Sequence, residues 1–433
     1  MNKLLVVAIC LGSMLASSCD DPQEKPQPPA EAADYDVMGL EEIPVGLWVT
    51  PPSGYQNSYE YGRIRECGFN FVNGFHYFEN SNLKIVQALD FCKENNLKYF
   101  ANKAVVADDI IKYANKPDDT LLKKFTDGIK PYMAHPAFAG ELLMDEPGKP
   151  LFSAIARFSQ AFKKSYPDKL WHVNLFPMYA TGGIQAPSYA DYINNWMIEL
   201  DPEFVSYDSY PLLTDGKITT DYFYNLDLIR SKTRFKKIPF WVFIQTLAIQ
   251  GTPGVPDKRE PSESDLRWQV WTSLAFGAKG IQYFTYWTPG GGTEQFGNAL
   301  ITPDGQKTVR YDYVKKLNSD FLGIGKVLLD CHAEGVIQTA ATPVQLHSPL
   351  SSFGPVVQIT GDDAMTGCFT APDGKKKILI VPMMPEKTAK VNIQLQNVTK
   401  ANLWRNNQAA EIQISNQLLE VSVGSGEAVF VEF

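Results

Sequence analysis

Short apolar runs alternate along the chain with longer stretches in which apolar residues recur at helical spacing. In residues 82–95, for example, Leu83, Val86, Leu89 and Phe91 recur near this spacing and indicate an amphipathic helix. Strands separated by such helices form βαβ units and therefore a parallel sheet. The strand-like runs are Pro44–Thr50, Phe69–Phe75, Leu97–Val105, Phe138–Glu146, Leu170–Phe176, Phe204–Tyr210, Pro239–Ala248 and Gly280–Thr288.

Eight such units in about 290 residues predict a (β/α)8 barrel, the TIM-barrel fold of the α/β class, over residues 43–330. The alternative is an open doubly wound sheet, but no Gly-x-Gly-x-x-Gly motif or phosphate-binding loop follows any strand. After residue 330 the pattern changes to short alternating or β-branched runs, separated by Asp-Gly, Asn and Gly turns. Residues 331–433 are therefore expected to form a small antiparallel β-sandwich domain.

An apolar run near the start of the sequence indicates export. Lys3 precedes the run Leu4–Ala16, which is too short to span a bilayer permanently and is followed by small residues and Cys19. Residues 1–18 thus resemble a bacterial lipoprotein signal peptide, in which the cysteine is acylated and becomes the new N-terminus. Ordinary secretory cleavage near Ser18 is the alternative.

The segment after Cys19 favours a surface location. Residues 19–42 are polar and rich in proline, which is typical of a tether that buries no surface. The acidic pair Asp20-Asp21 resembles the export tag of surface lipoproteins in Gram-negative gut bacteria. We therefore expect an outer-membrane lipoprotein on the cell surface or the periplasmic side. Its lipid would be its only membrane contact, because no later segment reaches about 18 consecutive apolar residues.

The composition of the chain indicates which kinds of molecule it could bind. The net charge is −8 and no block of Lys or Arg occurs, which argues against a nucleic-acid binder, because neutralising phosphates requires clustered positive charge. Aromatic residues make up 12% of the chain, and their faces suit sugar rings. Four cysteines remain after the signal peptide and the lipidated residue, and none has zinc-site spacing. We expect buried free thiols, with a Cys67–Cys92 disulfide as the alternative, and neither a metal nor a cofactor.

The candidate catalytic and sugar-binding residues lie at the strand ends, because catalytic groups of a (β/α)8 barrel come from the C-terminal ends of its strands. These ends carry polar and aromatic residues while the strand interiors are apolar, as expected of a sugar-binding cleft. Plain packing is the alternative for each aromatic side chain. The candidates for contact with a sugar are Trp48, His76, Asn174, Tyr207, Tyr210, Gln245 and Trp287.

The fourth strand carries the main catalytic candidate. A period of two puts Leu142, Met144 and Glu146 on one face, so that Glu146 would point into the barrel mouth above apolar residues. Burial and the neighbouring charge of Asp145 would both raise the pKa of Glu146, which suits a general acid near neutral pH. The alternative is an acidic pair that caps the next helix.

The sixth strand supplies the partner candidate. Asp208 shares its face with Ser206 and Tyr210, whose hydroxyls can donate hydrogen bonds that keep a carboxylate ionised. A protonated Glu and an ionised Asp across a cleft divide the work of glycoside hydrolysis. A structural Asp in the turn before Pro211 is the alternative.

Three motifs together resemble (β/α)8 glycoside hydrolases distantly related to bacterial β-galactosidases of the large retaining clan. They are Met144-Asp145-Glu146-Pro147, Tyr207-Asp208-Ser209-Tyr210-Pro211 and the stretch from Arg267-Trp268-Gln269-Val270-Trp271 to Ala275-Phe276-Gly277-Ala278-Lys279-Gly280-Ile281. The resemblance covers residues 43–326 and implies that Glu146 is the acid/base. The clan's nucleophile, a Glu after strand seven, is replaced here by Gln245, and the Asn before its acid/base is replaced by Asp145.

These departures leave three explanations, because an amide cannot act as the nucleophile. Asp208 acts as base or nucleophile; or Asp145 orients a sugar N-acetyl group beside Glu146; or the chain binds glycan without cleaving it. We therefore expect a glycosidase acting on an oligo- or polysaccharide, with a non-catalytic glycan-binding lipoprotein of a sugar-uptake system as the competing hypothesis. A metal-dependent hydrolase lacks a ligand cluster, and an esterase lacks the Gly-x-Ser-x-Gly elbow.

Overall fold

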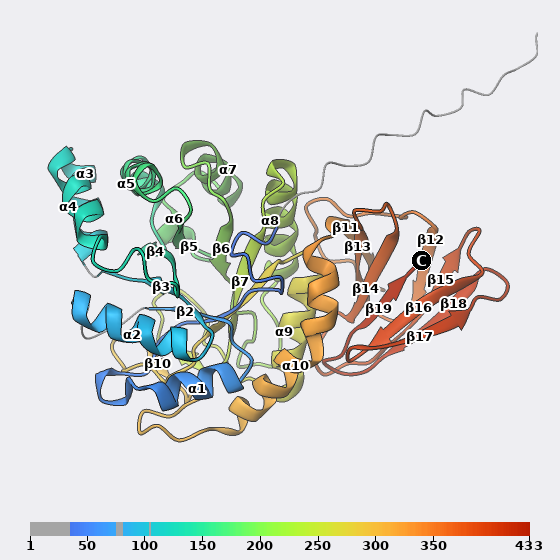
Figure 1. Cartoon of the computed structure of the whole chain (residues 1–433). Helices are drawn as coiled ribbons and strands as arrows, with labels where there is room; N and C mark the ends of the chain where they lie inside the picture. Colours follow the sequence, from blue (N-terminus) through green and yellow to red (C-terminus); the bar gives the residue numbers. More distant parts are fainter. Residues whose placement is uncertain (1–34, 75–80, 104) are drawn as a thin grey trace, which may run out of the picture.

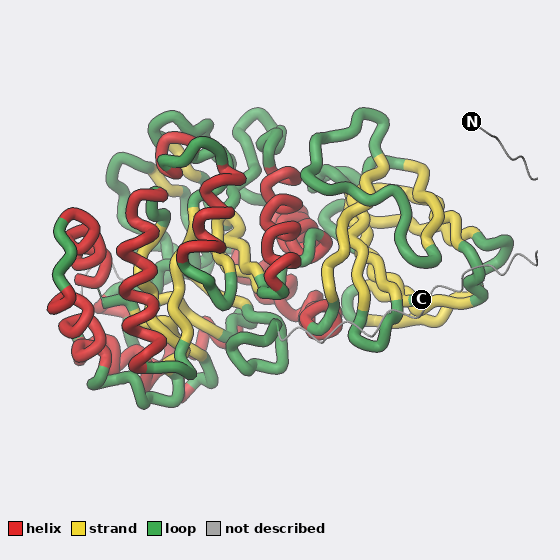
Figure 2. The backbone as a smooth tube through the Cα atoms, turned by 90° about the horizontal axis from the view of Figure 1, so that it is seen from above, coloured by secondary structure: helices red, strands yellow, loops and turns green. Residues whose placement is uncertain are grey.

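The computed structural model describes residues 35–74, 81–103 and 105–433. A barrel wrapped by helices and a unit made of β-sheets lie next to each other (Figure 1). Seen from above, the helices surround the strands of the barrel, whereas the second unit consists of strands and loops (Figure 2). The (β/α)8 barrel followed by antiparallel sheets confirms the predicted fold class.

Eight parallel strands close the barrel. Each strand pairs with its neighbours in chain order, and the first strand pairs with both the second and the last, which closes the sheet. The strands are β1 (Val45–Leu47), β2 (Phe71–Asn73), β3 (Lys98–Ala101), β4 (Phe138–Asp145), β5 (Leu170–Leu175), β6 (Val205–Asp208), β7 (Phe240–Gln245) and β9 (Gly280–Phe284).

Helices cover the outside of the barrel. In α5, for example, Phe152, Ile155, Phe158 and Phe162 are buried at helical spacing, which gives this helix one apolar face toward the core. No helix in the described part of the chain is long and apolar enough to cross a bilayer. The helices are α1 (Ser58–Glu66), α2 (Asn82–Glu94), α3 (Val105–Asn115), α4 (Asp119–Ile129), α5 (Phe152–Ser165), α6 (Thr181–Ile184), α7 (Tyr189–Glu199), α8 (Tyr222–Lys236), α9 (Glu263–Ala275) and α10 (Val309–Leu329).

The inside of the barrel changes from apolar to polar along the strands. Near their N-terminal ends, large side chains form one cluster, in which the rings of Phe204 and Trp241 stack 4.1 Å apart. Two residues further along β6 is Ser206, and two further is Asp208, both buried. Because every second residue of a strand faces the same side, the sequence itself places an apolar floor beneath polar groups at the C-terminal end.

The second unit contains two antiparallel sheets with the strand orders β11-β13-β14-β19-β16-β17 and β12-β15-β18. A separate cluster of buried Val, Ile and Leu side chains forms its core. The strands are β11 (His332–Thr339), β12 (Val356–Gly361), β13 (Ala364–Thr370), β14 (Lys376–Pro382), β15 (Ala389–Leu395), β16 (Lys400–Arg405), β17 (Gln408–Gln413), β18 (Leu418–Val423) and β19 (Val429–Glu432).

Helices α8 and α9 attach the sheets to the barrel. The indole nitrogen of Trp268 donates to the carbonyl oxygen of Pro382 over 2.9 Å. The buried guanidinium of Arg267 lies 3.0 Å from the carboxylate of Glu427, and that of Arg230 donates to the carbonyl oxygen of Glu334 over 3.0 Å. Buried polar contacts of this kind fix the orientation of one unit against the other.

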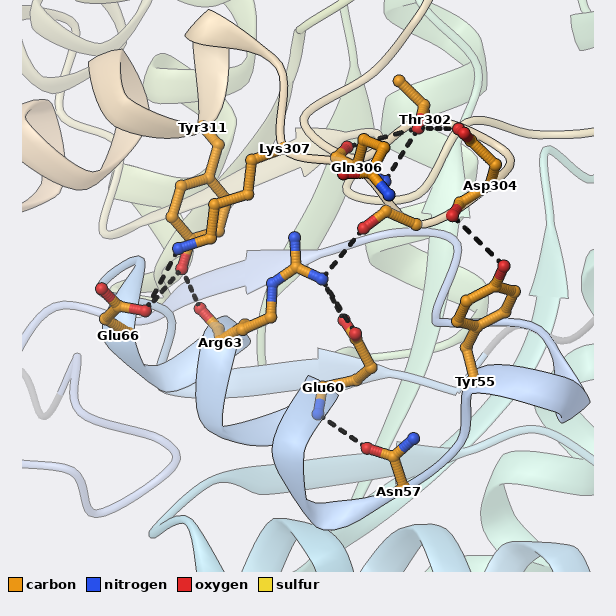
Figure 3. A network of polar contacts seen from close by, with 11 residues as sticks. Tyr55, Asn57, Glu60, Arg63, Glu66, Thr302, Asp304, Gln306, Lys307 and Tyr311 are labelled. Carbon is orange, nitrogen blue, oxygen red and sulfur yellow. Dashed lines mark hydrogen bonds and ion pairs between the residues drawn. The ribbon is translucent and has the colours of Figure 1, made fainter.

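The loop after β9 is held against α1 (Figure 3). Arg63 pairs with Glu60 at 2.8 Å and donates to the carbonyl oxygen of Gly305 over 3.1 Å, while the hydroxyl of Tyr55 donates to that of Asp304 over 3.2 Å. The ring of Trp287 packs beneath this loop, with its centre 4.8 Å from that of Tyr55. The network therefore fixes one side of the barrel mouth.

The four cysteines of the described chain are buried free thiols, as predicted. They are Cys67, Cys92, Cys331 and Cys368.

Candidate active site

A cavity of about 630 Å³ opens at the C-terminal ends of the barrel strands. Its walls come partly from the strand ends and partly from the loops 176–183 and 249–258. A short two-stranded sheet, β8 (Ile249–Gln250) with β10 (Gln295–Phe296), contributes Ile249 and Phe296 to the wall. This is the end of the barrel where (β/α)8 enzymes bind their substrates.

The end of β4 carries Asp145 and Glu146, but strict alternation does not describe it. The pairing of β4 with β5 is irregular between Leu142 and Met144, so that Asp145 lies opposite Asn174. The side chains of Asp145 and Asn174 are in hydrogen-bonding contact. The prediction that Leu142, Met144 and Glu146 share one face is therefore wrong, because the β-bulge inserts a residue and shifts the alternation.

Glu146 reaches the site through its backbone conformation. Its φ angle is +46°, in the left-handed region, and its N–H donates to the carbonyl oxygen of Asn174 over 2.8 Å. Such a conformation costs a non-glycine residue of the order of 1 kcal/mol and often marks a functional position. Here the turn brings the half-buried carboxyl of Glu146 into hydrogen-bonding contact with that of the buried Asp208.

The two carboxyls hold protons differently. Burial, above all, raises the pKa of Glu146, and the charges of Asp208 and Asp145 raise it further. Burial also raises the pKa of Asp208, but its hydrogen bonds with Glu146 and Asn174 lower it. The amide of Asn174 donates to Asp208 and so favours its ionised form, and we therefore assign the proton shared by the pair to Glu146. Pushing apart the pKa values of two neighbouring carboxyls is how active sites separate an acid from a carboxylate.

Asn174 connects the third carboxyl to this pair. Its amide nitrogen donates to Asp208 over 3.0 Å, and its amide oxygen accepts from the hydroxyl of Ser206 over 3.1 Å. Asp145 contacts the same amide and is exposed to the solvent of the cavity. Although Asp145 reaches the cavity, the protein packed around its carboxyl displaces water and raises its pKa to about 6, while its contact with Asn174 lowers it.

A ladder of buried hydrogen bonds continues from Ser206 across the barrel. The hydroxyl of Ser206 accepts from Gln282 over 2.8 Å, and the amide oxygen of Gln282 accepts from Asn73 over 2.9 Å. The amide oxygen of Asn73 lies 2.9 Å from Nδ1 of His172, which is buried; burial lowers its pKa to about 3 and keeps it neutral. Nδ1 therefore donates. A connected buried network of this kind gives the carboxyls above it a defined position.

Some of the predicted sugar-contacting residues line the cavity and others do not. Trp48, Asn174 and Tyr210 line the cavity together with the three carboxyls. His76 lies outside the described residues, as does the predicted lipidation site Cys19.

Three predicted residues lie away from the cavity, which corrects their expected position. Tyr207 faces outward between Ser206 and Asp208 and packs toward the ring of Phe240. The amide of Gln245 donates to the carbonyl oxygens of Leu247 and Arg259, over 3.0 and 2.6 Å. Trp287 is buried beneath the loop that α1 holds.

Several lining residues were not predicted. Phe243 follows Trp241 by two residues on β7, so alternation was a usable signal for it. Phe176, Tyr179, Lys258 and Glu294 come from loops, where no periodicity indicates the direction of a side chain. The carboxylate of Glu294 accepts from the hydroxyl of Thr252 over 2.7 Å, which joins the two loops that flank β8 and β10.

Part of the chain matches a known protein family. Residues 152–323 match the family model of glycoside hydrolase family 42, described as beta-galactosidase; the matched segment contains Asp208 and begins after Glu146. No curated protein sequence matches the chain.

Solved structures share the fold. A catalytic mutant of Gan42B, a family 42 β-galactosidase from G. stearothermophilus, superposes with a TM-score of 0.66 at 9% identity, over 92% of this chain and 99% of that one. The β-galactosidase from Rahnella sp. R3 gives 0.58 at 10% identity, over 91% and 98%. The β-galactosidase from Marinomonas ef1 gives 0.51 at 13% identity, over 67% of this chain and only 62% of that one. The family match covers less than half of the chain, and the solved structures share its fold.

Proposed function

We propose that this protein is a glycosidase in which Glu146 protonates the oxygen of the leaving sugar. The observation that carries this proposal is the contact between Glu146 and Asp208 at the base of an aromatic-lined cavity. Because the proton of the pair lies on Glu146, this side chain is an acid at the pH at which an isolated carboxyl has already lost its proton. Trp48, Tyr179 and Phe243 supply faces for the sugar rings.

The close contact also limits the role of Asp208. Retaining glycosidases hold their two carboxyls about 5 Å apart and inverting ones about 6.5–9.5 Å apart, because the anomeric carbon, with or without a water, lies between them. Hydrogen-bonded carboxyls leave no such space. In this arrangement Asp208 keeps Glu146 protonated. Asp145, which is exposed in the cavity, is then the carboxyl placed to act on the reacting sugar, directly or by orienting an N-acetyl group.

The second candidate function is glycan binding without cleavage. It is favoured by Gln245, which ends β7 where the resemblance expects a catalytic Glu and whose amide is held by backbone carbonyls outside the cavity. Product formation separates the two functions, since a binding protein releases no new reducing ends.

A substrate panel tests the proposed activity. The relatives are named β-galactosidases, so the panel starts with aryl β-galactosides and adds aryl β-N-acetylhexosaminides and plant and host polysaccharides. We expect release of the aryl group or of reducing ends from at least one of these substrates. Affinity for a glycan with no release of product would establish the binding function in place of catalysis.

We also propose that the chain is a lipoprotein anchored through Cys19, on the cell surface or the periplasmic side of the outer membrane. The support is the apolar run Leu4–Ala16, the small residues before Cys19 and the polar tether after it. Radioactive palmitate should label the wild type and leave the Cys19→Ala variant unlabelled. Equal labelling of both proteins would exclude this anchor.

A further inference from the structure

Lys258 stands out among the residues that line the cavity. Its side chain is only 2% exposed, although it belongs to the cavity wall. Among the described residues its ammonium group has no hydrogen-bonding partner, and it lies 4.8 Å from the centre of the Tyr179 ring. A buried ammonium without an acceptor is costly and requires an explanation.

The position of Lys258 is fixed by its backbone. Its N–H donates to the carbonyl oxygen of Ile249 over 2.7 Å, and the N–H of Ile249 donates back over 3.2 Å. A second bridge joins Lys258 to Leu213 on its other side. The side chain therefore starts from ordered backbone held between two segments.

The charges around the cavity make Lys258 distinctive. The other ionisable groups among the described lining residues are acidic or phenolic, and they include Asp145, Glu146, Asp208 and Glu294. Glu146 and Asp208 share a proton, which reduces the negative charge at the base of the cavity. Burial lowers the pKa of Lys258 to about 8, although the charge of Asp221 raises it, so that its ammonium is charged at neutral pH.

The ammonium of Lys258 lies over the ring of Tyr179. This half-buried residue lines the cavity and gives the ammonium a cation–π contact, which is worth about 0.5–2 kcal/mol. A charge-assisted hydrogen bond to a carboxylate or sulfate is stronger than a bond between neutral groups. An anionic group that entered the cavity would therefore displace the ring of Tyr179 and accept a hydrogen bond from the ammonium of Lys258.

We propose that Lys258 recognises an anionic substituent of the glycan, namely the carboxylate of a uronic acid or a sulfate ester. The inference rests on the proposed function, because it assigns the chemical class of substrate to the same cavity. A neutral hydroxyl would also accept from Lys258, but it would add no negative charge beside a buried ammonium that only the charge of Asp221, which forms no ion pair with it, offsets among the described residues.

Binding measurements test this inference without requiring turnover. Calorimetry in the Glu146→Gln background compares D-galacturonate and D-glucuronate with D-galactose and D-glucose, and galactose 6-sulfate with galactose. We expect one anionic sugar to bind at least about 10-fold tighter than its neutral parent, in line with a charge-assisted bond. The two arms distinguish a uronate from a sulfate as the preferred group.

Variants assign the preference to Lys258. Lys258→Met removes the charge at similar length and should abolish the preference, whereas Lys217→Met, an exposed lysine on a loop, should keep it. If the methionine variant does not fold, Lys258→Gln takes its place. No preference in the parent, or the same preference in the Lys258 variant, would overturn the inference. Anion preference without any hydrolysis by the wild type would reject the proposed catalysis alone.

Discussion

Replacing Glu146 with Gln is expected to lower kcat by about 10²–10⁴-fold, the usual contribution of a general acid. Gln keeps the shape of the side chain but has no acidic proton to give to the departing oxygen. The Michaelis constant should change little, because the Gln amide can still donate a hydrogen bond to the substrate and to Asp208. Steady-state kinetics on the best substrate of the panel measures both constants.

A comparison of substrates with different leaving groups tests the role of Glu146 more specifically. A dinitrophenyl group departs without protonation, so the loss in Glu146→Gln should be much smaller for a dinitrophenyl glycoside than for a natural disaccharide. Glu411→Gln makes the same chemical change on β17, where the carboxylate pairs with Lys400 at the surface, and should leave kcat unchanged. Hydrolysis of a disaccharide at the wild-type rate by Glu146→Gln would contradict the assignment of the acid.

The barrel could be predicted because its strands and helices have local, periodic patterns of apolar and polar residues. On β6, Phe204, Ser206 and Asp208 follow one another at a period of two, which places an apolar floor and a carboxyl on the same inner face. The same periodicity shows that Tyr207 faces outward. Tyr207 was predicted to contact a sugar because it lies near the strand end, but its side chain is on the outer face of the strand.

The site itself depended on features that have no such signal. The bulge in β4 moves Asp145 into the inner position, and only the positive φ of Glu146 brings its carboxyl to Asp208. Neither residue type marks these features, since positive φ is usual for Gly and uncommon for Glu. Lys258 faces the cavity because its loop pairs with Ile249, a long-range contact that no pattern of neighbouring residues predicts.

Replacing Asp208 with Asn is expected to move the alkaline limb of the pH–kcat/KM profile to lower pH by about 1–2 units. In the wild type the charge of Asp208 raises the pKa of Glu146, as does the hydrogen bond between them. Asn has no charge, and its amide can donate to ionised Glu146, so the pKa of Glu146 falls. A general acid works only while protonated, and a lower pKa means that the proton is lost at lower pH. Because the pKa of Glu146 is raised to about 11 in the wild type, activity above about pH 9 should therefore fall more than activity at pH 7.

The Ser206→Ala variant distinguishes the effect of the charge of Asp208 from the effect of its position. This variant removes the 3.1 Å hydrogen bond to Asn174 and the 2.8 Å hydrogen bond from Gln282, both of which support Asp208, but keeps the carboxylate. Its kcat should fall by about 5–30-fold, as expected for loss of two buried hydrogen bonds of about 0.5–1 kcal/mol each, while its alkaline limb stays in place. An alkaline limb that does not move in Asp208→Asn, or that moves to higher pH, would show that Asp208 does not hold the proton on Glu146. In that case the two carboxyls would have to separate before the sugar binds, and Asp208 would again be free to act as the base.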